Sequence, residues 1–498
     1  MKKKIITLCV FALISFNIFA DTDIKNKQIG LLNKIGYGVT EKSLNALEKE
    51  GVDNWLKKQL NQPNLWDDSE IEKRYLFPNS REELFKEYKN HDFVLLGNKS
   101  DAEYFFGENG VVTKSLIKRV DYALNSENRL REMMVWFWFN HFNIGPNTNN
   151  ISAQFVFDFE NKIRTNALGN FKDLLKMVSK HPTMLYYLNN TENRDVKDDP
   201  IYGLNENYAR EFLELHTLGV NGGYAQEDVK ELARILTGFS IIHFLNYQGE
   251  VKDFSKIKNY DDMRKVIEKE YKWSFSNYVL EDFFLFKGQY HDYGNKVFLG
   301  NNIKGEGINE LDKVIDIVVS HPSTAKFLSK KMAVYFLEDN PSEEIINKMV
   351  SSYLQSKGDI AKTLEPLFFS KEFKETLENP TKIKDTYTFM VSTIKTTLQN
   401  NPGQNESIKR ELIYILKNIE ADPYFKSTPE GFSVYGKDWL SSSRMQEQIY
   451  FVLTMLNRYE NNKEYPINYK LLSLVAKKPI KDKQSAFKLL TSENWLKR

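Results

Sequence analysis

The sequence predicts a mainly α protein, with a large multi-helix domain and a small β-hairpin insert near residues 270–300. Three observations support this fold class. Apolar residues recur at intervals of three and four over most of the 498 residues, which is the helical period. Proline is sparse, and no Gly/Ser-rich linker divides the chain. Alternation of aromatic with turn residues is confined to about 270–300, where FFLFKGQYHDYGNKVFLG (283–300) indicates a hairpin.

The first 20 residues, MKKKIITLCVFALISFNIFA, have the layout of a secretory signal peptide. Three lysines precede an apolar segment over 5–19, and Ala20 is a small residue suited to cleavage. The alternative is an N-terminal membrane anchor, but the segment is shorter than the roughly 20 residues that a spanning helix needs. No later stretch is apolar enough to cross a membrane. We therefore expect an exported protein, periplasmic or extracellular, with no transmembrane segment after cleavage.

Charge and cysteine content exclude several function classes. Cleavage removes three of the 69 basic residues and no acidic one, so the balance with the 67 acidic residues is close to zero. Non-specific nucleic-acid binding needs a basic excess, so no nucleic-acid partner is expected. The single cysteine, Cys9, lies in the leader, and the mature chain therefore has neither disulfides nor thiol chemistry. No Gly-rich phosphate loop, GxSxG elbow or HExxH pattern occurs, so those enzyme motifs are absent.

Helical periodicity defines the elements in order. EKSLNALEKEGVDNWLKKQL (41–60) predicts two helices separated at Gly51, and NSENRLREMMVWFWFNHF (125–142) predicts a central helix that is apolar on nearly every side. Further helices are predicted over 171–180, 206–218, 226–239, 308–320, 323–337, 342–356, 360–370, 381–398 and 445–458. Together they predict one large helical domain over 21–460, followed by a basic, partly helical C-terminal extension over 461–498.

Two of these helices end at a His-Pro pair, His181-Pro182 and His321-Pro322, after similar apolar patterns. Proline ends one helix and fits the first turn of the next, so each pair predicts a helix–turn–helix corner. We expect the histidine to help close the end of the first helix. Duplication of a whole helical unit is the alternative interpretation.

The segment NENYAREFLELHTLGVNGGY (205–224) holds the main candidate site. At about 100° per residue, one helical face carries Asn207, Arg210, Glu211 and Glu214, and His216 lies on the opposite side. The spacing differs from the Glu-x-x-His of a metal-binding helix. No metal or other cofactor is assigned.

Two interpretations of this face remain open. In the functional one, Glu211 and Glu214 form a carboxylate pair for acid–base catalysis with split pKa values, and Arg210 binds an anionic group. In the structural one, Arg210 and the two glutamates form an ion-pair network with neighbouring helices. Gly219 is expected to end the helix in a left-handed conformation.

Polar residues in apolar or turn-rich surroundings add further candidates. Asn140 and His141 lie in WFWFNHF (136–142) and need hydrogen-bond partners there. His291 and Asp292 lie with Lys296 in the predicted hairpin. This pair either serves as a general base or metal ligand, or stabilises a turn.

Over nearly the whole mature chain, the sequence resembles the secreted bacterial family catalogued as domain of unknown function 1800. The resemblance rests on 205–239 together with 31–60, MMVWFWFNHFNI (133–144), HPTMLYYLNN (181–190), YHDYGNKVFLG (290–300), HPSTAKFLSKKM (321–332) and GKDWLSSSRM (436–445). It implies an exported, predominantly helical protein. Genes of this family often neighbour those of a second secreted family related to sulfatases, which implies a secreted sulfatase-like protein as a candidate partner.

The residues that match the family's signature are Asn207, Arg210, Glu211, Glu214, His216, Thr217, Gly219, Asp228, Arg234, Gly238, His291, Asp292, Gly294 and Lys296. Two positions depart from the family's pattern. Ala225 replaces a hydroxyl residue that caps the following helix, which weakens that cap by roughly 1 kcal/mol. Phe239 replaces a tryptophan, which makes sugar stacking at that position a weaker expectation.

The leading hypothesis is an exported hydrolase-like enzyme that acts on an envelope or extracellular glycan, with acidic or sulfated glycans among the candidate substrates. The predicted catalytic residues are Glu211, Glu214, His216, His291 and Asp292; the predicted substrate-binding residues are Asn207, Arg210, Arg234, Lys296, Asn140 and His141. The alternative is a non-catalytic export or assembly partner of a secreted sulfatase-like protein, in which the same residues form a structural network.

Overall fold

The computed structural model describes residues 24–61, 66–75, 77, 107, 110–145, 150–195, 203–241, 265, 278–281, 284–400, 402–424 and 426–498. The expected signal peptide over 1–20 lies outside these ranges. Among the residues described, no helix combines the length and the apolar character that crossing a membrane requires.

Helices make up most of the described chain, which confirms the predicted mainly α fold. The first half contains a helical segment over 24–35, α2 (Glu41–Glu50), α3 (Val52–Asn61), α4 (Ser69–Arg74), α7 (Val111–Asn125), α8 (Arg129–His141), α9 (Asn150–Asn166), α10 (Phe171–Lys180), α11 (Pro182–Tyr187), α12 (Asn207–Glu211), the π-helix η3 (Phe212–Thr217) and α13 (Gln226–Ile235). The second half contains α16 (Glu310–Ser320), α17 (Pro322–Phe336), α18 (Glu343–Gln355), α19 (Ile360–Phe368), α20 (Lys371–Glu378), α21 (Thr386–Thr397), α22 (Glu406–Asn418), α23 (Ser442–Tyr459), α24 (Tyr469–Ala476), α25 (Lys483–Leu490) and α26 (Glu493–Leu496).

The strands form two small antiparallel sheets. β1 (Phe239–Ile241), β2 (Tyr278–Glu281) and β3 (Phe284–Lys287) form one sheet in the order β1-β3-β2, with Phe239 opposite Phe286. β4 (Lys296–Phe298) and β5 (Asn301–Ile303) form a separate hairpin. The segment expected to form one hairpin, 283–300, is therefore divided between two sheets.

The helix predicted over 226–239 ends earlier, at Ile235, because Gly238 redirects the chain. Gly238 has a positive φ of +79°, and a Cβ there would lie 2.6 Å from the carbonyl oxygen of Lys287. Its N–H donates to the Asn193 carbonyl at 3.0 Å, and its own carbonyl accepts from the Lys287 N–H at 2.8 Å. Only glycine fits this close approach, and the next residues pair as β1.

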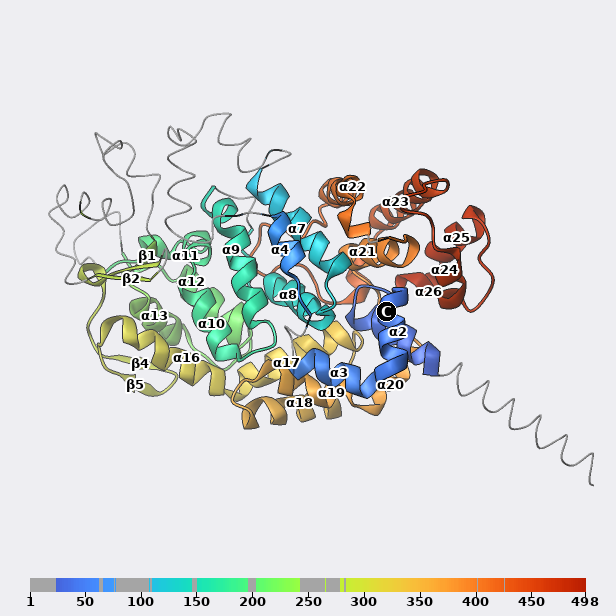
Figure 1. Ribbon diagram of the computed structural model, residues 1–498. Coiled ribbons are helices and arrows are strands. Elements are labelled where there is room, and N and C mark those ends of the chain that lie inside the picture. The colour runs from blue at the N-terminus through green and yellow to red at the C-terminus, as the bar shows by residue number, and fades with distance from the viewer. Residues whose placement is uncertain are drawn as a thin grey trace, which may run out of the picture.

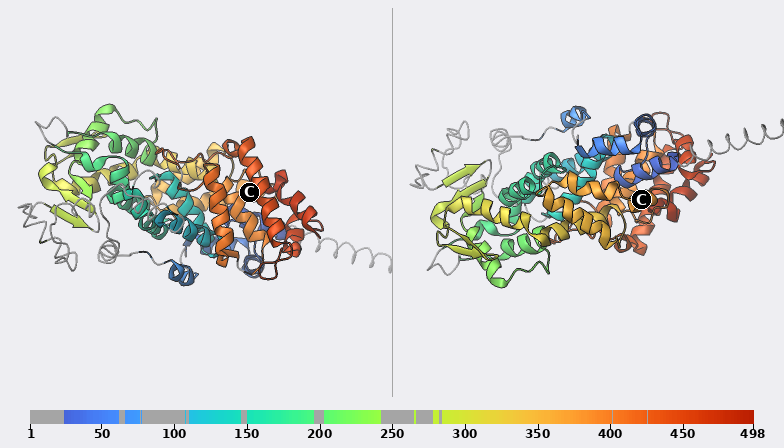
Figure 2. Two further views of the ribbon diagram at one scale, coloured as in Figure 1. Left: turned by 90° about the horizontal axis from the view of Figure 1, so that it is seen from above. Right: turned by 90° about the horizontal axis from the view of Figure 1, so that it is seen from below.

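The helices enclose one continuous core in an elongated molecule. Both sheets and α13 lie at one end, α23, α24 and α25 lie at the other, and α8, α10 and α17 lie between them (Figure 1). Every residue of α8 is buried, which confirms that this apolar helix is central. Views from above and below show the same order along the long axis (Figure 2).

The two ends of the described chain meet. The Nζ of Lys34 donates to the carbonyls of Leu337 at 3.0 Å and Arg498 at 3.4 Å. The extension over 461–498 contains α24, α25 and α26 and contributes to the core Ile467, Leu471, Leu472, Ile480, Leu490 and Trp495. Residues 461–498 therefore pack on the core of the helical domain.

Both His-Pro pairs form the predicted helix–turn–helix corners, between α10 and α11 and between α16 and α17. We expected each histidine to close the end of the first helix, but its side chain bonds to the second helix. The Nδ1 of His181 accepts from the N–H of Thr183 at 3.3 Å, and that of His321 accepts from Ser323 at 3.1 Å. Each imidazole therefore caps the start of the second helix, because its backbone is extended there and its ring nitrogen reaches the free N–H groups of the first turn.

Candidate functional site

The helix that carries Glu211 and Glu214 changes from α to π after Glu211. The N–H of Leu218 donates to the carbonyl of Leu213, five residues earlier, at 2.9 Å. The hydroxyl of Thr217 donates to the Phe212 carbonyl at 2.7 Å. Gly219 then ends the helix at φ +83°, as expected, and a Cβ there would lie 3.0 Å from the ring of Phe327. Single π-helical turns are rare and occur frequently at functional sites.

Glu211 and Glu214 are both partly exposed. Within the described ranges, neither carboxylate forms a hydrogen bond or an ion pair. Burial, followed by the negative charges of Glu214 and Glu430, raises the pKa of Glu211, and Arg210 opposes this shift. Glu211 is thus a carboxyl group that holds its proton more strongly than usual beside a second carboxylate.

Two tyrosines and a loop glutamate surround this carboxylate pair. Burial and the charges of Glu430 and Glu211 raise the pKa of Tyr187, at the end of α11. Burial and the charge of Glu214 raise that of Tyr224, just before α13. The sequence motifs contain both tyrosines without marking them as special, and no local pattern marks Glu430. We call Glu211, Glu214, Tyr187, Tyr224 and Glu430 the carboxylate face.

Asn140 positions the loop that carries Glu430. Its Nδ2 donates to the carbonyl of Phe432 at 2.8 Å, and its Oδ1 accepts from the Phe432 N–H at 2.7 Å. Asn143 holds the same loop through the carbonyls of Lys426 and Thr428, at 2.8 and 2.7 Å. Asn140 also lines a cavity of only about 20 Å³, which holds about one water molecule. Its contacts position backbone, and the small cavity leaves no room for a sugar.

Arg210 and Asn207 lie next to the carboxylate face but bond elsewhere. The Nη2 of Arg210 donates to Glu206 and to Gln226, each at 3.0 Å. The Nδ2 of Asn207 donates to the carbonyl of Leu188 at 3.1 Å. The ion-pair network that the structural interpretation expects therefore involves Glu206, while Glu211 and Glu214 remain outside it.

His216 lies away from the glutamates, as the helical wheel predicts, and is fully buried. Neither ring nitrogen has a hydrogen-bond partner in the part of the chain that the structure describes. The rings of Phe142 and Tyr208 lie 5.1 and 6.4 Å from its centre. Burial, and then the charge of Lys331, lower the pKa of His216 to about 3. This imidazole is therefore neutral and shielded from a substrate at the carboxylate face.

His141 connects His216 to Lys331. Its Nε2 bonds to the carbonyl oxygen of His216 at 3.1 Å, so this nitrogen carries the proton, because a carbonyl only accepts. Its Nδ1 is then an acceptor for the Nζ of Lys331 at 3.0 Å. Burial, Lys331 and His216 lower the pKa of His141 well below its usual value. Sequence reasoning missed Lys331, although the residue lies in the segment HPSTAKFLSKKM.

His291 and Lys296 belong to a second, closed cluster around Glu310. The Nε2 of His291 bonds to Glu310 Oε1 at 3.0 Å, and Lys296 donates to Oε2 at 2.7 Å. The N–H of Gly307 adds a third bond to this carboxylate at 2.9 Å. All three charged or titratable side chains are fully buried. Because each polar group is paired, this cluster has the character of a structural network.

Asp292 and Arg234 extend that network to α13. The Nε of Arg234 donates to Asp292 at 2.7 Å, and Nη1 donates to Glu231 at 2.6 Å. Burial raises the pKa of Asp292, but hydrogen bonds from Arg234 and Gly294 outweigh burial and lower it below its usual value. We call Arg234, Asp292, His291, Lys296 and Glu310 the closed network. The predicted site residues thus fall into separate groups.

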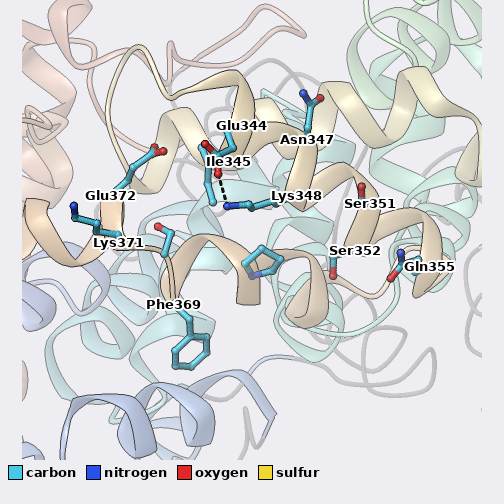
Figure 3. A pocket seen from close by; sticks show the side chains of 12 residues that line it. Glu344, Ile345, Asn347, Lys348, Ser351, Ser352, Gln355, Phe369, Lys371 and Glu372 are labelled. Carbon is cyan, nitrogen blue, oxygen red and sulfur yellow. Dashed lines mark hydrogen bonds and ion pairs between the residues drawn. The ribbon is translucent and has the colours of Figure 1, made fainter.

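Open cavities lie elsewhere. One of about 970 Å³ runs between α18, α19 and α20, where Glu344 and Lys348 pair at 2.5 Å (Figure 3). A second, of about 450 Å³, lies among α4, α7, α8 and α9. Two of its carboxylates have cationic partners, since Asp68 pairs with Arg131 and Glu72 with Lys118, and Asp67 accepts hydrogen bonds from Ser69. No predicted site residue lines either cavity. Within the described ranges, no group of three or more His, Cys, Asp or Glu side chains is placed to hold a metal ion.

Comparison with known proteins gives one match. The family model described as "Protein of unknown function (DUF1800)" matches residues 30–494, which is nearly the whole chain. No curated protein and no solved structure matches the chain.

Proposed function

The chain belongs to the DUF1800 family, and within that family we propose that this protein is an exported hydrolase-like enzyme that acts on an envelope or extracellular glycan. The observation that carries the proposal is the raised pKa of Glu211 beside Glu214, on a partly exposed face where neither carboxylate has a cationic partner among the residues described. A buried structural pair would be neutralised by a cation. Two neighbouring carboxylates that have no cationic partner are better suited to acid–base chemistry.

Glycoside hydrolysis typically uses two carboxyl groups. One donates its proton to the oxygen of the bond that breaks, and the other assists the attack of water or of a nucleophile on the sugar. We assign Glu211 the acid role, because its pKa is raised. Glu214 takes the second role. Tyr187 and Tyr224 are both partly exposed and close enough to this pair for its charges to raise their pKa values, and we assign them the role of apolar contacts for a sugar ring.

The charge of the carboxylate face bears on the substrate class. Glu211 and Glu214 repel anionic groups, whereas Glu430 is paired with Lys426 at 3.3 Å. Arg210 is already bonded to Glu206 and Gln226. A neutral or amino sugar therefore suits this face. An acidic or sulfated glycan fits the proposal only if Arg210 exchanges Glu206 for an anionic group of the substrate, which its partly exposed position allows.

The second candidate function is a non-catalytic export or assembly partner of a secreted sulfatase-like protein. The closed network favours a non-catalytic role. Its polar side chains are hydrogen-bonded to neighbouring protein groups, as the contacts of His291, Asp292, Lys296 and Arg234 show. In that case the carboxylate face is a contact surface for the partner.

Release of new reducing ends from envelope and extracellular polysaccharides tests the enzyme proposal. The wild-type protein is expected to release them, and Glu211→Gln and Glu214→Gln to lower the rate by at least about 100-fold, the usual size of an acid–base contribution. Glu227→Gln is the matched control, because this exposed carboxylate on α13 has only a 3.8 Å ion pair with Lys230. Equal rates in wild type and both glutamine variants would reject the assignment.

A further inference from the structure

Lys331 has an unusual set of neighbours for a lysine. Its Nζ lies 3.0 Å from His141 Nδ1 and 5.9 Å from the ring centre of Phe327. The side chain is partly exposed on α17. Within the described ranges, no carboxylate pairs with it. A lysine ammonium is ordinarily stabilised by water or by an anion. Here a neutral imidazole and an aromatic ring lie where water or an anion would otherwise be.

The protonation state of His141 follows from its other bond. Nε2 donates to the carbonyl of His216, so Nδ1 presents a lone pair to the lysine. The titratable groups that face Lys331 are His141 on α8 and His216 on η3, and both have lowered pKa values. Neither histidine carries a negative charge that would stabilise the ammonium form of Lys331. Burial correspondingly lowers the pKa of Lys331 to about 8.

We propose that Lys331 is a nucleophilic amine that forms an imine with the carbonyl group of an aldehyde or ketone. The lone pair of the neutral amine adds to the carbonyl carbon, and a proton moves from nitrogen to oxygen to give a carbinolamine. The oxygen then leaves as water with the second amine proton, as the C=N bond forms. One amine and one carbonyl thus give one imine and one water, with no change in oxidation state.

His141 is the positioning residue for this step. By accepting a hydrogen bond from the amine at Nδ1, it fixes the direction of one N–H and leaves the lone pair to point elsewhere. Desolvated lysines next to apolar groups are the usual source of Schiff-base chemistry in proteins. The inference concerns a different side chain from the carboxylate pair, so it stands whether or not glycan hydrolysis is found.

Reductive labelling of the full chain tests the proposal. Glyceraldehyde forms an imine with a neutral lysine, cyanoborohydride reduces this to a stable secondary amine, and peptide mass spectrometry measures the rate at each lysine across a pH series. Lys330 and Lys326 are matched controls, because both are exposed on the same helix. An ordinary lysine has a pKa of about 10.4.

The labelling rate of Lys331 is expected to reach half its maximum near pH 8, whereas the rate at an ordinary lysine still rises above that pH. At neutral pH, Lys331 should be labelled at least about tenfold faster than Lys330, because far more of its amine is neutral. A Lys331 rate that is no higher than that of Lys330, or that follows the same pH profile, overturns the proposal. This comparison needs no variant.

His141→Glu adds a test of the positioning role. A carboxylate in this place would pair with the ammonium, so the midpoint for Lys331 should move up towards that of an ordinary lysine. If the Nζ of Lys331 did not lie beside position 141, the introduced carboxylate would leave the midpoint unchanged. Lys331→Arg keeps the positive charge and should abolish labelling at this position. If His141→Glu does not fold, the wild-type profile still decides the proposal.

Discussion

Glu211 and Glu310 are glutamates with opposite surroundings. Glu310 is fully buried and accepts from His291, Lys296 and Gly307. Glu211 is partly exposed, and among the charged groups described near it Glu214 and Glu430 raise its pKa whereas Arg210 lowers it. The sequence predicted which residues share the helical face of Glu211. It did not predict which groups surround each site residue, because these groups belong to other elements of the chain. Examples are Glu310, Gln226 and Glu430.

Glu211→Gln should stabilise the protein at neutral pH. The pKa of Glu211 is raised in the folded state, so ionisation above that pKa favours unfolding, and an uncharged glutamine removes this effect. Below the unfolded-state pKa of about 4.3, both states bind the proton and the gain disappears. Thermal unfolding across a pH series measures this. A lower melting temperature of Glu211→Gln at neutral pH would contradict the raised pKa.

Glu310→Gln should have the opposite effect. It leaves the buried ammonium of Lys296 without its carboxylate, which costs about 3–5 kcal/mol of unfolding free energy. Urea unfolding measures this cost. The double variant Glu310→Gln with Lys296→Met should lose less than the sum of the single variants, since the two groups interact. Additive losses would show that the pair is not coupled.

At the scale of elements, the helices were well predicted wherever an apolar stripe was present. The break at Gly51, α10 and the two His-Pro corners follow the sequence closely. The π-helical turn η3 was not predicted, because a period of 3.6 residues fits FLELHT as well as any other helix. Strand β1 was missed for a different reason: Phe239 continues the apolar pattern of α13, and only the contact of Gly238 with Lys287 redirects it.

His321 offers a direct test of the corner that joins α16 to α17. Its Nδ1 accepts from the N–H of Ser323 at 3.1 Å. His321→Ala should lower the unfolding free energy by about 1 kcal/mol, whereas His321→Asn, whose side chain also caps helices, should retain most of it. Chemical denaturation of the three proteins measures the difference. Equal stability of His321→Ala and wild type would mean that the cap contributes nothing.

At the scale of the whole molecule, the fold class and the helical nature of the chain were predictable from composition and periodicity. The long-range contacts were not. Lys34 bonds to Arg498, and Asn140 bonds to Phe432, across separations that no local pattern encodes. The same limit applies to the candidate site, since the separation of the carboxylate face from the closed network depends on how distant elements pack.

Trp495 tests whether the C-terminal extension belongs to the folding unit. It is buried, and its Nε1 donates to the hydroxyl of Thr393 at 2.9 Å. Trp495→Ala should cost about 3–5 kcal/mol and lower the stability of the whole chain in one transition. Trp495→Phe should cost less. A separate early transition, with the rest of the protein unaffected, would show that the extension folds by itself.

We propose that Glu211 and Glu214 serve function and are not needed for folding. Complementation of a strain that lacks this gene tests it most directly, with the double variant Glu211→Gln and Glu214→Gln produced at the wild-type level. We expect this variant to accumulate as a soluble, folded protein that does not restore the wild-type phenotype. Full complementation by the double variant, or loss of soluble protein in place of loss of function, would contradict it.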